Sequence, residues 1–157
     1  MISIPAPAKL TLTLSVTGVR DDGYHLIDAE MVTLDLGDTL DISQGGHGVR
    51  YVGMHAPPPG DDLVTRARLL AQVAASVTVH KKIPPGAGLG GGSADAAAVL
   101  RWAGITDIDA AVSLGADVGF CLVGGRARVR GIGEIIEPLD DVELTFTLLT
   151  PPVSCST

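Results

Sequence analysis

The chain has 157 residues, enough for one domain that buries about 70% of the surface that its unfolded chain exposes. Its net charge of −7 at pH 7 disfavours a nucleic-acid partner, because binding to a phosphate backbone requires a basic face. Aromatic residues are only 3% of the chain, so aliphatic side chains must build the core, and the two cysteines, Cys121 and Cys155, are too few for a disulfide framework and lack metal-ligand spacing.

The N-terminal segment does not resemble a secretory signal, because Pro5 and Pro7 interrupt it and no cationic residue precedes them. Residues 8–16 alternate between apolar and polar side chains, which predicts a half-buried strand with Lys9 on its polar face. A turn is predicted at residues 20–23. Further strands are predicted over residues 24–36, 39–43 and 49–52.

The second half of the chain mixes helices with strands. Residues 55–62 are predicted to form a loop with an acidic end that caps a helix from Leu63 to about Ala75. A strand at 76–80, a glycine-rich segment, an Ala-rich helix stopped by Gly104 and a short helix after Asp107 are expected to follow. The last predicted strands cover residues 120–123, 127–129, 134–137 and 144–150.

This order of elements predicts an α/β two-layer sandwich, in which one sheet packs against helices, instead of a doubly wound parallel sheet. No run of apolar residues approaches the 18 or so that a membrane span needs. Together with the low cysteine content, this predicts a cytoplasmic protein without a membrane partner.

The glycine-rich segment is the strongest functional signal. It is called the glycine loop below and comprises Pro84, Pro85, Gly86, Ala87, Gly88, Leu89, Gly90, Gly91, Gly92, Ser93 and Ala94. Its glycines allow a ligand to approach the backbone closely, and Ser93 is expected to cap the following helix. Unpaired N–H groups at a helix N-terminus favour an anion, most often a phosphate.

Other interpretations of this loop fit less well. The spacing of Gly86, Gly88 and Gly91 matches the dinucleotide fingerprint formally, but two prolines separate it from the strand. No Gly-Lys-Ser/Thr sequence closes a Walker loop. A flexible surface loop stays an alternative, although the Pro-Pro start and the strongly helical end argue against it.

Spacing alone assigns no chemistry to the charged residues. A strand lysine such as Lys9 is most often a solvated residue that protects a sheet edge. Asp117, between glycine and apolar segments, is typical of a turn or cap, and Tyr24 with His25 is typical of packing. The remaining histidines, His47, His55 and His80, show no metal spacing with cysteines or acidic residues, so no metal site is predicted.

Four blocks nevertheless resemble one family. Residues 7–12, 22–25, 83–97 and 115–118 are similar, in the same order, to the signature blocks of the 4-diphosphocytidyl-2-C-methyl-D-erythritol kinase family. That family belongs to the galactokinase, homoserine kinase, mevalonate kinase and phosphomevalonate kinase (GHMP) superfamily. The resemblance covers nearly all of residues 1–157, but only the N-terminal, ATP-binding domain of the family.

This resemblance implies a fold similar to the second domain of ribosomal protein S5. It also implies that the glycine loop wraps the phosphates of ATP, with Mg²⁺ as the counter-ion. Asp117 would accept a proton from the 2-hydroxyl of a cytidine-diphosphate sugar alcohol, and Lys9 would keep Asp117 ionised. Tyr24 and His25 would hold the cytosine of this small-molecule substrate, in a route of isoprenoid synthesis that does not use mevalonate.

The chain departs from the family at several positions. Thr11 stands where an Asn is usual on the substrate side, Asp62 where an Asn usually helps to hold adenine, and His80 where an acidic residue is common. Gly119 replaces a proline, which is expected to loosen the backbone that carries Asp117. Residues 151–157 resemble the crossing into a C-terminal domain, which the chain would then lack.

Three functional hypotheses follow from the resemblance. The chain is an ATP-dependent kinase, a non-catalytic remnant that keeps the fold, or one half of a split enzyme whose partner chain supplies the second domain. Without that domain we expect poor turnover, and self-association or capture of a partner through an uncovered apolar face. An RNA-binding module is a fourth alternative, against which the net charge of −7 argues.

Overall fold

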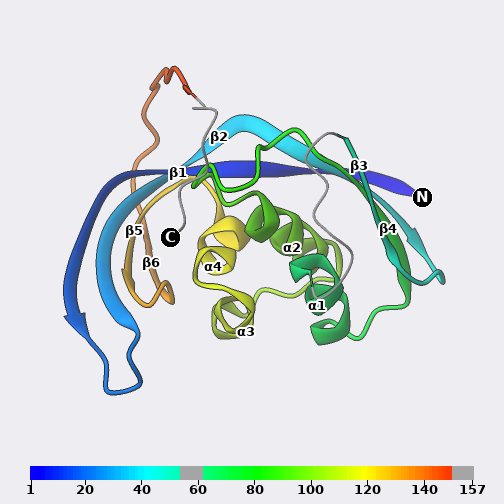
Figure 1. Cartoon of the computed structure of the whole chain (residues 1–157), viewed down its shortest axis with the longest axis horizontal. Helices are drawn as coiled ribbons and strands as arrows, with labels where there is room; N and C mark the ends of the chain where they lie inside the picture. Colours follow the sequence, from blue (N-terminus) through cyan, green and yellow to red (C-terminus); the bar gives the residue numbers. More distant parts are fainter. Residues whose placement is uncertain (54–61, 150–157) are drawn as a thin grey trace.

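The computed structural model describes residues 1–53 and 62–149. In this part of the chain, four helices cover one face of a six-stranded sheet, so the predicted two-layer α/β architecture is confirmed (Figure 1). The strands are β1 (Ile2–Val19), β2 (His25–Gln44), β3 (Val49–Val52), β4 (Ala75–His80), β5 (Arg126–Gly131) and β6 (Ile135–Pro138). The helices are α1 (Leu63–Leu70), α2 (Gly91–Trp102), α3 (Ile108–Leu114) and α4 (Ala116–Val123).

Strand β2 is the central strand of the sheet and pairs with three other strands. It pairs antiparallel with β1 along one edge. Along the other edge its N-terminal part, residues 27–32, pairs with β5, and its C-terminal part, residues 39–44, pairs with β4. Strand β3 extends the sheet parallel to β4, and β6 extends it antiparallel to β5. Residues 33–38 of β2 therefore lie between the segments that pair with β5 and with β4.

The core lies between the sheet and helix α2. Residues Ala94 to Leu100 of α2 are all buried, because α1, α4 and the strands surround this helix. Phe120 of α4 is the largest fully buried side chain, and Leu40 and Ile42 of β2 pack in the same cluster. A core made almost entirely of Ala, Val, Leu and Ile agrees with the low aromatic content.

The long first strand differs from its predicted burial. Alternation predicted that Leu14 and Val16 face the core, but each is 60% exposed. The helices cover only the first half of β1, and register shifts occur between Pro7 and Lys9 and between Thr11 and Thr13. Lys9, predicted to be solvated, is only 8% exposed. The shifts turn the strand, so one alternating pattern does not describe its whole length.

Several predicted element boundaries were wrong. Residues 120–123 belong to helix α4, since a short apolar run does not distinguish a strand from a buried helix. Helix α1 ends at Leu70, two residues before Gln72, which has a positive φ of 53°. Residues 25–36 and 39–43 fall in one continuous strand, β2, which begins one residue after Tyr24. Residues 139–149 have no regular secondary structure. The short helix after Asp107 is confirmed.

Gly119 allows α3 and α4 to pack closely. A Cβ atom at this position would lie 2.7 Å from Cγ2 of Val112 in α3. We expect Gly119→Ala to lower the free energy of unfolding by about 1–2 kcal/mol, because overpacking outweighs the gain in helix propensity. Gly92→Ala is the control, since its Cβ would meet Leu63 at an ordinary 3.6 Å. Urea denaturation checks both, and equal stability of the two variants would contradict the prediction.

Other expectations fall outside the described residues. These are the greater part of the 55–62 loop, His55, Cys155, the last residue of the 144–150 strand and the crossing segment at 151–157. In the part that the structure describes, no helix is long and apolar enough to cross a membrane.

Candidate active site

The glycine loop joins β4 to α2 and lines a pocket of about 430 Å³. Gly86, Gly88 and Gly90 have positive φ values of 68°, 71° and 65°, conformations that other residues rarely adopt. The predicted cap at Ser93 was wrong, because α2 starts two residues earlier and Gly90 is its N-cap. The N-terminus of α2 therefore opens directly into the pocket, where its N–H groups favour an anion.

Side chains from three other segments complete this pocket. Tyr51 of β3, Asp62 with Leu63 at the start of α1, and Lys81 after β4 line it together with the loop. The pocket therefore combines backbone N–H groups of the loop with polar and apolar side chains of other segments, a combination that suits a nucleotide.

Lys9 and Asp117 lie in contact, as predicted, although they are far apart in the sequence. Lys9 Nζ lies 3.2 Å from Asp117 Oδ2 and also donates a hydrogen bond of 3.1 Å to Thr11 Oγ1. The Lys9 side chain is 10% exposed and that of Asp117 33%. Asp117 is in the first turn of α4, so its carboxylate also lies near the positive end of that helix.

The backbone connects this ion pair to the glycine loop. The backbone N–H of Lys9, in β1, donates to the carbonyl of Leu89 in the loop at 3.0 Å. A Cβ atom on Gly90 would lie 2.9 Å from Cγ of Lys9, so a larger residue at 90 would displace the lysine. The arrangement places the Lys9–Asp117 pair beside the glycine loop.

A second pocket, of about 670 Å³, lies next to the start of α4. Tyr24 lines it, as do Gly115 and Ala116, the two residues before Asp117. Tyr24 is 59% exposed, and the Arg20 guanidinium lies 5.8 Å from the centre of its ring, within the range of a cation–π contact. His25, the exposed first residue of β2, and Thr11 are not among the lining residues.

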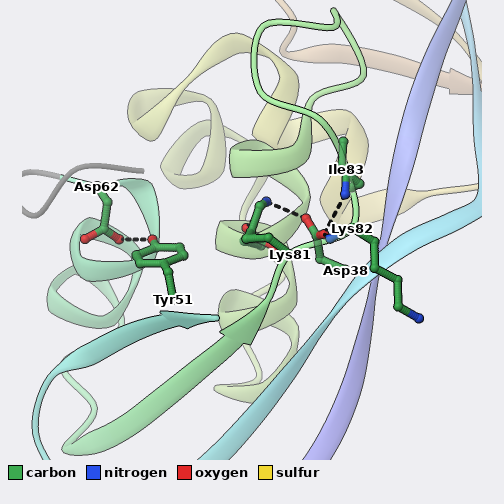
Figure 2. A network of polar contacts seen from close by, with 7 residues as sticks. Asp38, Tyr51, Asp62, Lys81, Lys82 and Ile83 are labelled. Carbon is green, nitrogen blue, oxygen red and sulfur yellow. Dashed lines mark hydrogen bonds and ion pairs between the residues drawn. The ribbon is translucent and has the colours of Figure 1, made fainter. Parts of the chain in front are cut away.

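Sequence reasoning missed a buried ionic cluster under the first pocket. Lys81 Nζ pairs with the carboxylate of Asp38 (Figure 2). It also lies 2.7 Å from Asp95 Oδ2. Asp38 Oδ1 also accepts the backbone N–H groups of Lys82 and Ile83. Burial raises the pKa of Asp95 to about 7, although Lys81 opposes this shift. No sequence signal identified the cluster, because Asp38 falls in the short gap between the predicted strands 24–36 and 39–43.

Tyr51 and Asp62 form the other polar contact in this pocket. The Tyr51 hydroxyl donates to Asp62 Oδ1 at 2.6 Å (Figure 2), and burial together with this contact raises the pKa of Tyr51. Asp62 caps α1, as predicted, by accepting the Thr65 N–H at 2.8 Å. Burial alone would raise the pKa of Asp62, but these hydrogen bonds lower it, so the residue is an anionic acceptor.

The histidines do not build a metal centre in the described part of the chain. His80 Nε2 lies 2.8 Å from Asp41 Oδ2 on the surface of the sheet. No group of three or more His, Cys, Asp and Glu side chains within residues 1–53 and 62–149 is placed to hold a metal ion.

Comparisons with known proteins agree with this geometry. Residues 62–125 match the family model of the GHMP kinases N terminal domain. Proteins named 4-diphosphocytidyl-2-C-methyl-D-erythritol kinase are similar to the chain: that of Paracoccus denitrificans is 47% identical over 160 residues, and that of Ruegeria pomeroyi 43% over 167 residues. Each alignment covers 97% of this chain, which spans 57% and 59% of the length of those two relatives.

Two solved structures extend the comparison. A crystal structure of 4-(cytidine 5'-diphospho)-2C-methyl-D-erythritol kinase superposes with a TM-score of 0.71 at 37% identity, over 88% of this chain and 55% of that one. Homoserine kinase from Cytophaga hutchinsonii has a TM-score of 0.50 at 21% identity, over 83% of this chain and 48% of that one, and supports the fold alone. The chain is therefore similar, over nearly its whole length, to 4-diphosphocytidyl-2-C-methyl-D-erythritol kinases, and its residues 62–125 are similar to the N-terminal domain of GHMP kinases.

Proposed function

We propose that the chain supplies the nucleotide-binding part of a kinase that uses ATP to phosphorylate the 2-hydroxyl of 4-diphosphocytidyl-2-C-methyl-D-erythritol, in isoprenoid synthesis. The names of the relatives support this substrate. The observation that carries the proposal is the contact of Lys9 with Asp117 beside the glycine loop. A base and a cation next to an anion site are the groups that phosphoryl transfer to an alcohol requires.

In this proposal the glycine loop binds the phosphates of ATP through backbone N–H groups at residues 86–93. Gly86 and Gly88 fit this role, because nothing lies within 4 Å of the position of a Cβ atom on either residue. Mg²⁺ would neutralise phosphate charge, held chiefly by phosphate oxygens and water, since it typically keeps several water ligands. The adenine of ATP would lie toward Tyr51 and Asp62, which also line the pocket.

Asp117 then acts as the general base. Its carboxylate accepts the proton of the substrate 2-hydroxyl while that oxygen forms a bond to the γ-phosphorus and the bond to the β–γ bridging oxygen breaks. Lys9 stabilises the carboxylate before transfer and the negative charge on the attacking oxygen during it. Tyr24, in the pocket next to Asp117, would stack on the cytosine, with His25 and Thr11 as further polar contacts.

A charge test at Gly88 separates a phosphate site from a neutral pocket. Gly88→Asp and Gly88→Asn have similar shapes, and both residues tolerate the left-handed conformation at φ 71°. We expect ATP·Mg²⁺ at about 100 times its Kd to raise the Tm of the wild type by about 5–10 °C. The Asn variant should keep most of this shift, and the Asp variant should lose it through repulsion of the phosphates.

The outcomes of this thermal scan discriminate between the hypotheses. A shift that survives equally in both variants would show that the nucleotide phosphates lie elsewhere. No shift in the wild type at millimolar ATP would favour a remnant without nucleotide binding. ADP release in the presence of 4-diphosphocytidyl-2-C-methyl-D-erythritol, and not in its absence, tests the proposed acceptor.

A further inference from the structure

The buried cluster of Asp38, Lys81 and Asp95 has a position that a general core contact would not need. Lys81 precedes the glycine loop and Asp95 follows it, so their 2.7 Å contact closes the chain around the loop. Asp38, from β2, accepts the N–H groups of Lys82 and Ile83, the two residues before Pro84 (Figure 2). One cluster thus fixes both the start and the end of the loop.

Between these two ends the loop has few attachments. Leu89 is buried and its carbonyl accepts the Lys9 N–H, whereas residues 85–88 are exposed. The geometry of the exposed part therefore depends on where its ends are held. If the ends moved, the N–H groups that face the pocket would have to be ordered during ligand binding, which lowers affinity.

The composition of the cluster also argues for a positioning role. The side chains of Asp38, Lys81 and Asp95 are 0%, 6% and 1% exposed, and burying three ionisable groups has a large desolvation cost that apolar residues would avoid. Asp95 Oδ1 has no hydrogen-bond partner among the described residues, which is rare for a buried carboxylate. Stability alone does not account for such a cluster.

We propose that Asp38, Lys81 and Asp95 are positioning residues that clamp both ends of the glycine loop and thereby set its affinity for nucleotide. The inference rests on the proposed function for its ligand, but the clamp itself is a property of the nucleotide-free protein. Asp38 gives the sharpest test, because it is fully buried and does not line the pocket. An effect of Asp38 on binding must therefore act through the groups it contacts, which are the start of the loop and Lys81, and loop exchange separates the two.

The experiment compares Asp38→Asn, Lys81→Met and Lys81→Arg with the control Arg128→Met, which breaks the Arg128–Asp28 ion pair between β5 and β2. Two quantities are measured: the Kd of ATP·Mg²⁺ by calorimetry, and amide hydrogen exchange of residues 86–90 without nucleotide. Asp38→Asn and Lys81→Met should weaken binding by about ten-fold or more and speed exchange in the loop but not in β5. Lys81→Arg keeps the positive charge, so its Kd and its loop exchange should be close to those of the wild type. Arg128→Met should change neither the Kd nor the loop exchange.

Each result has a distinct meaning. Weaker binding by Lys81→Met with unchanged loop exchange would show that Lys81 contacts the nucleotide directly, and would overturn the clamp. Unchanged exchange and unchanged Kd in Asp38→Asn would also overturn it. If Asp38→Asn does not fold, Lys81→Met against Lys81→Arg provides the same comparison. If the wild type binds no ATP, the proposed function fails, whereas loop exchange in the variants still tests the clamp.

Discussion

Replacing Asp117 with Asn is expected to reduce the rate of phosphoryl transfer by about 10²–10⁴-fold, the usual contribution of general-base catalysis. The amide has nearly the same shape as the carboxylate, but it cannot accept the substrate proton. Lys9, whose Nζ lies 3.2 Å from the Asp117 carboxylate, would then face a neutral amide, and no carboxylate would remain for it to keep ionised. Initial rates of ADP release with the cytidine-diphosphate substrate, measured at saturating ATP, give the change in kcat directly.

The same substitution should leave the fold nearly unchanged. The Asp117 side chain is 33% exposed and that of Lys9 10%, so the loss of stability should fall between about 1 kcal/mol or less, typical of an exposed pair, and about 3–5 kcal/mol, typical of a fully buried one. Lys9 keeps its hydrogen bond to Thr11 Oγ1. A large loss of rate without a comparable loss of stability would locate the effect in the chemistry.

Asp28→Asn is the matched control for this experiment. Asp28 is 30% exposed, close to the 33% of Asp117, and its substitution removes an ion pair with Arg128, a residue outside the proposed site. We expect a rate within a factor of two or so of the wild type, as for most surface substitutions. A rate of Asp117→Asn above one tenth of the wild-type rate would rule out Asp117 as the base.

Local sequence signals predicted the parts of the site that depend on backbone chemistry. The Pro84–Pro85 start, the run of glycines and the Ala-rich helix after them specify the glycine loop, because each has a steric consequence that neighbours hardly change. Lys9 and Asp117 were identified only through the resemblance of their blocks to a family. Spacing alone indicated a solvated strand lysine and a turn residue, since a strand pattern carries no information on bulges.

The parts that were missed depend on tertiary packing. Asp38 falls in the short gap between two predicted strands, and its burial is set by α2, the glycine loop and the end of β4, which meet only in the fold. The apolar run at 120–123 suits a strand or a buried helix equally, and its neighbours α2 and α3 decide for the helix. Leu14 and Val16 alternate like core residues but extend beyond the helices that would cover them.

Replacing Asp95 with Asn is expected to change how stability depends on pH. In the folded protein burial raises the pKa of Asp95 to about 7, from 3.8 in the unfolded chain. Between these values the folded state keeps a proton that the unfolded state loses, so the contribution of Asp95 to stability decreases as the pH rises. It is fully present below pH 3.8 and is lost as the pH passes 7. Asn does not titrate and removes this dependence.

Urea denaturation of both proteins from pH 4.5 to 8 measures the effect. The free energy of unfolding of the wild type minus that of Asp95→Asn should fall by about 2–4 kcal/mol across this range, since each unit of pKa shift corresponds to about 1.4 kcal/mol. Asp28→Asn provides the control, because its pair with Arg128 lowers the pKa of Asp28, and the corresponding difference should stay constant above pH 4.5. A constant difference for Asp95→Asn would instead show that Lys81 outweighs burial and keeps Asp95 ionised throughout.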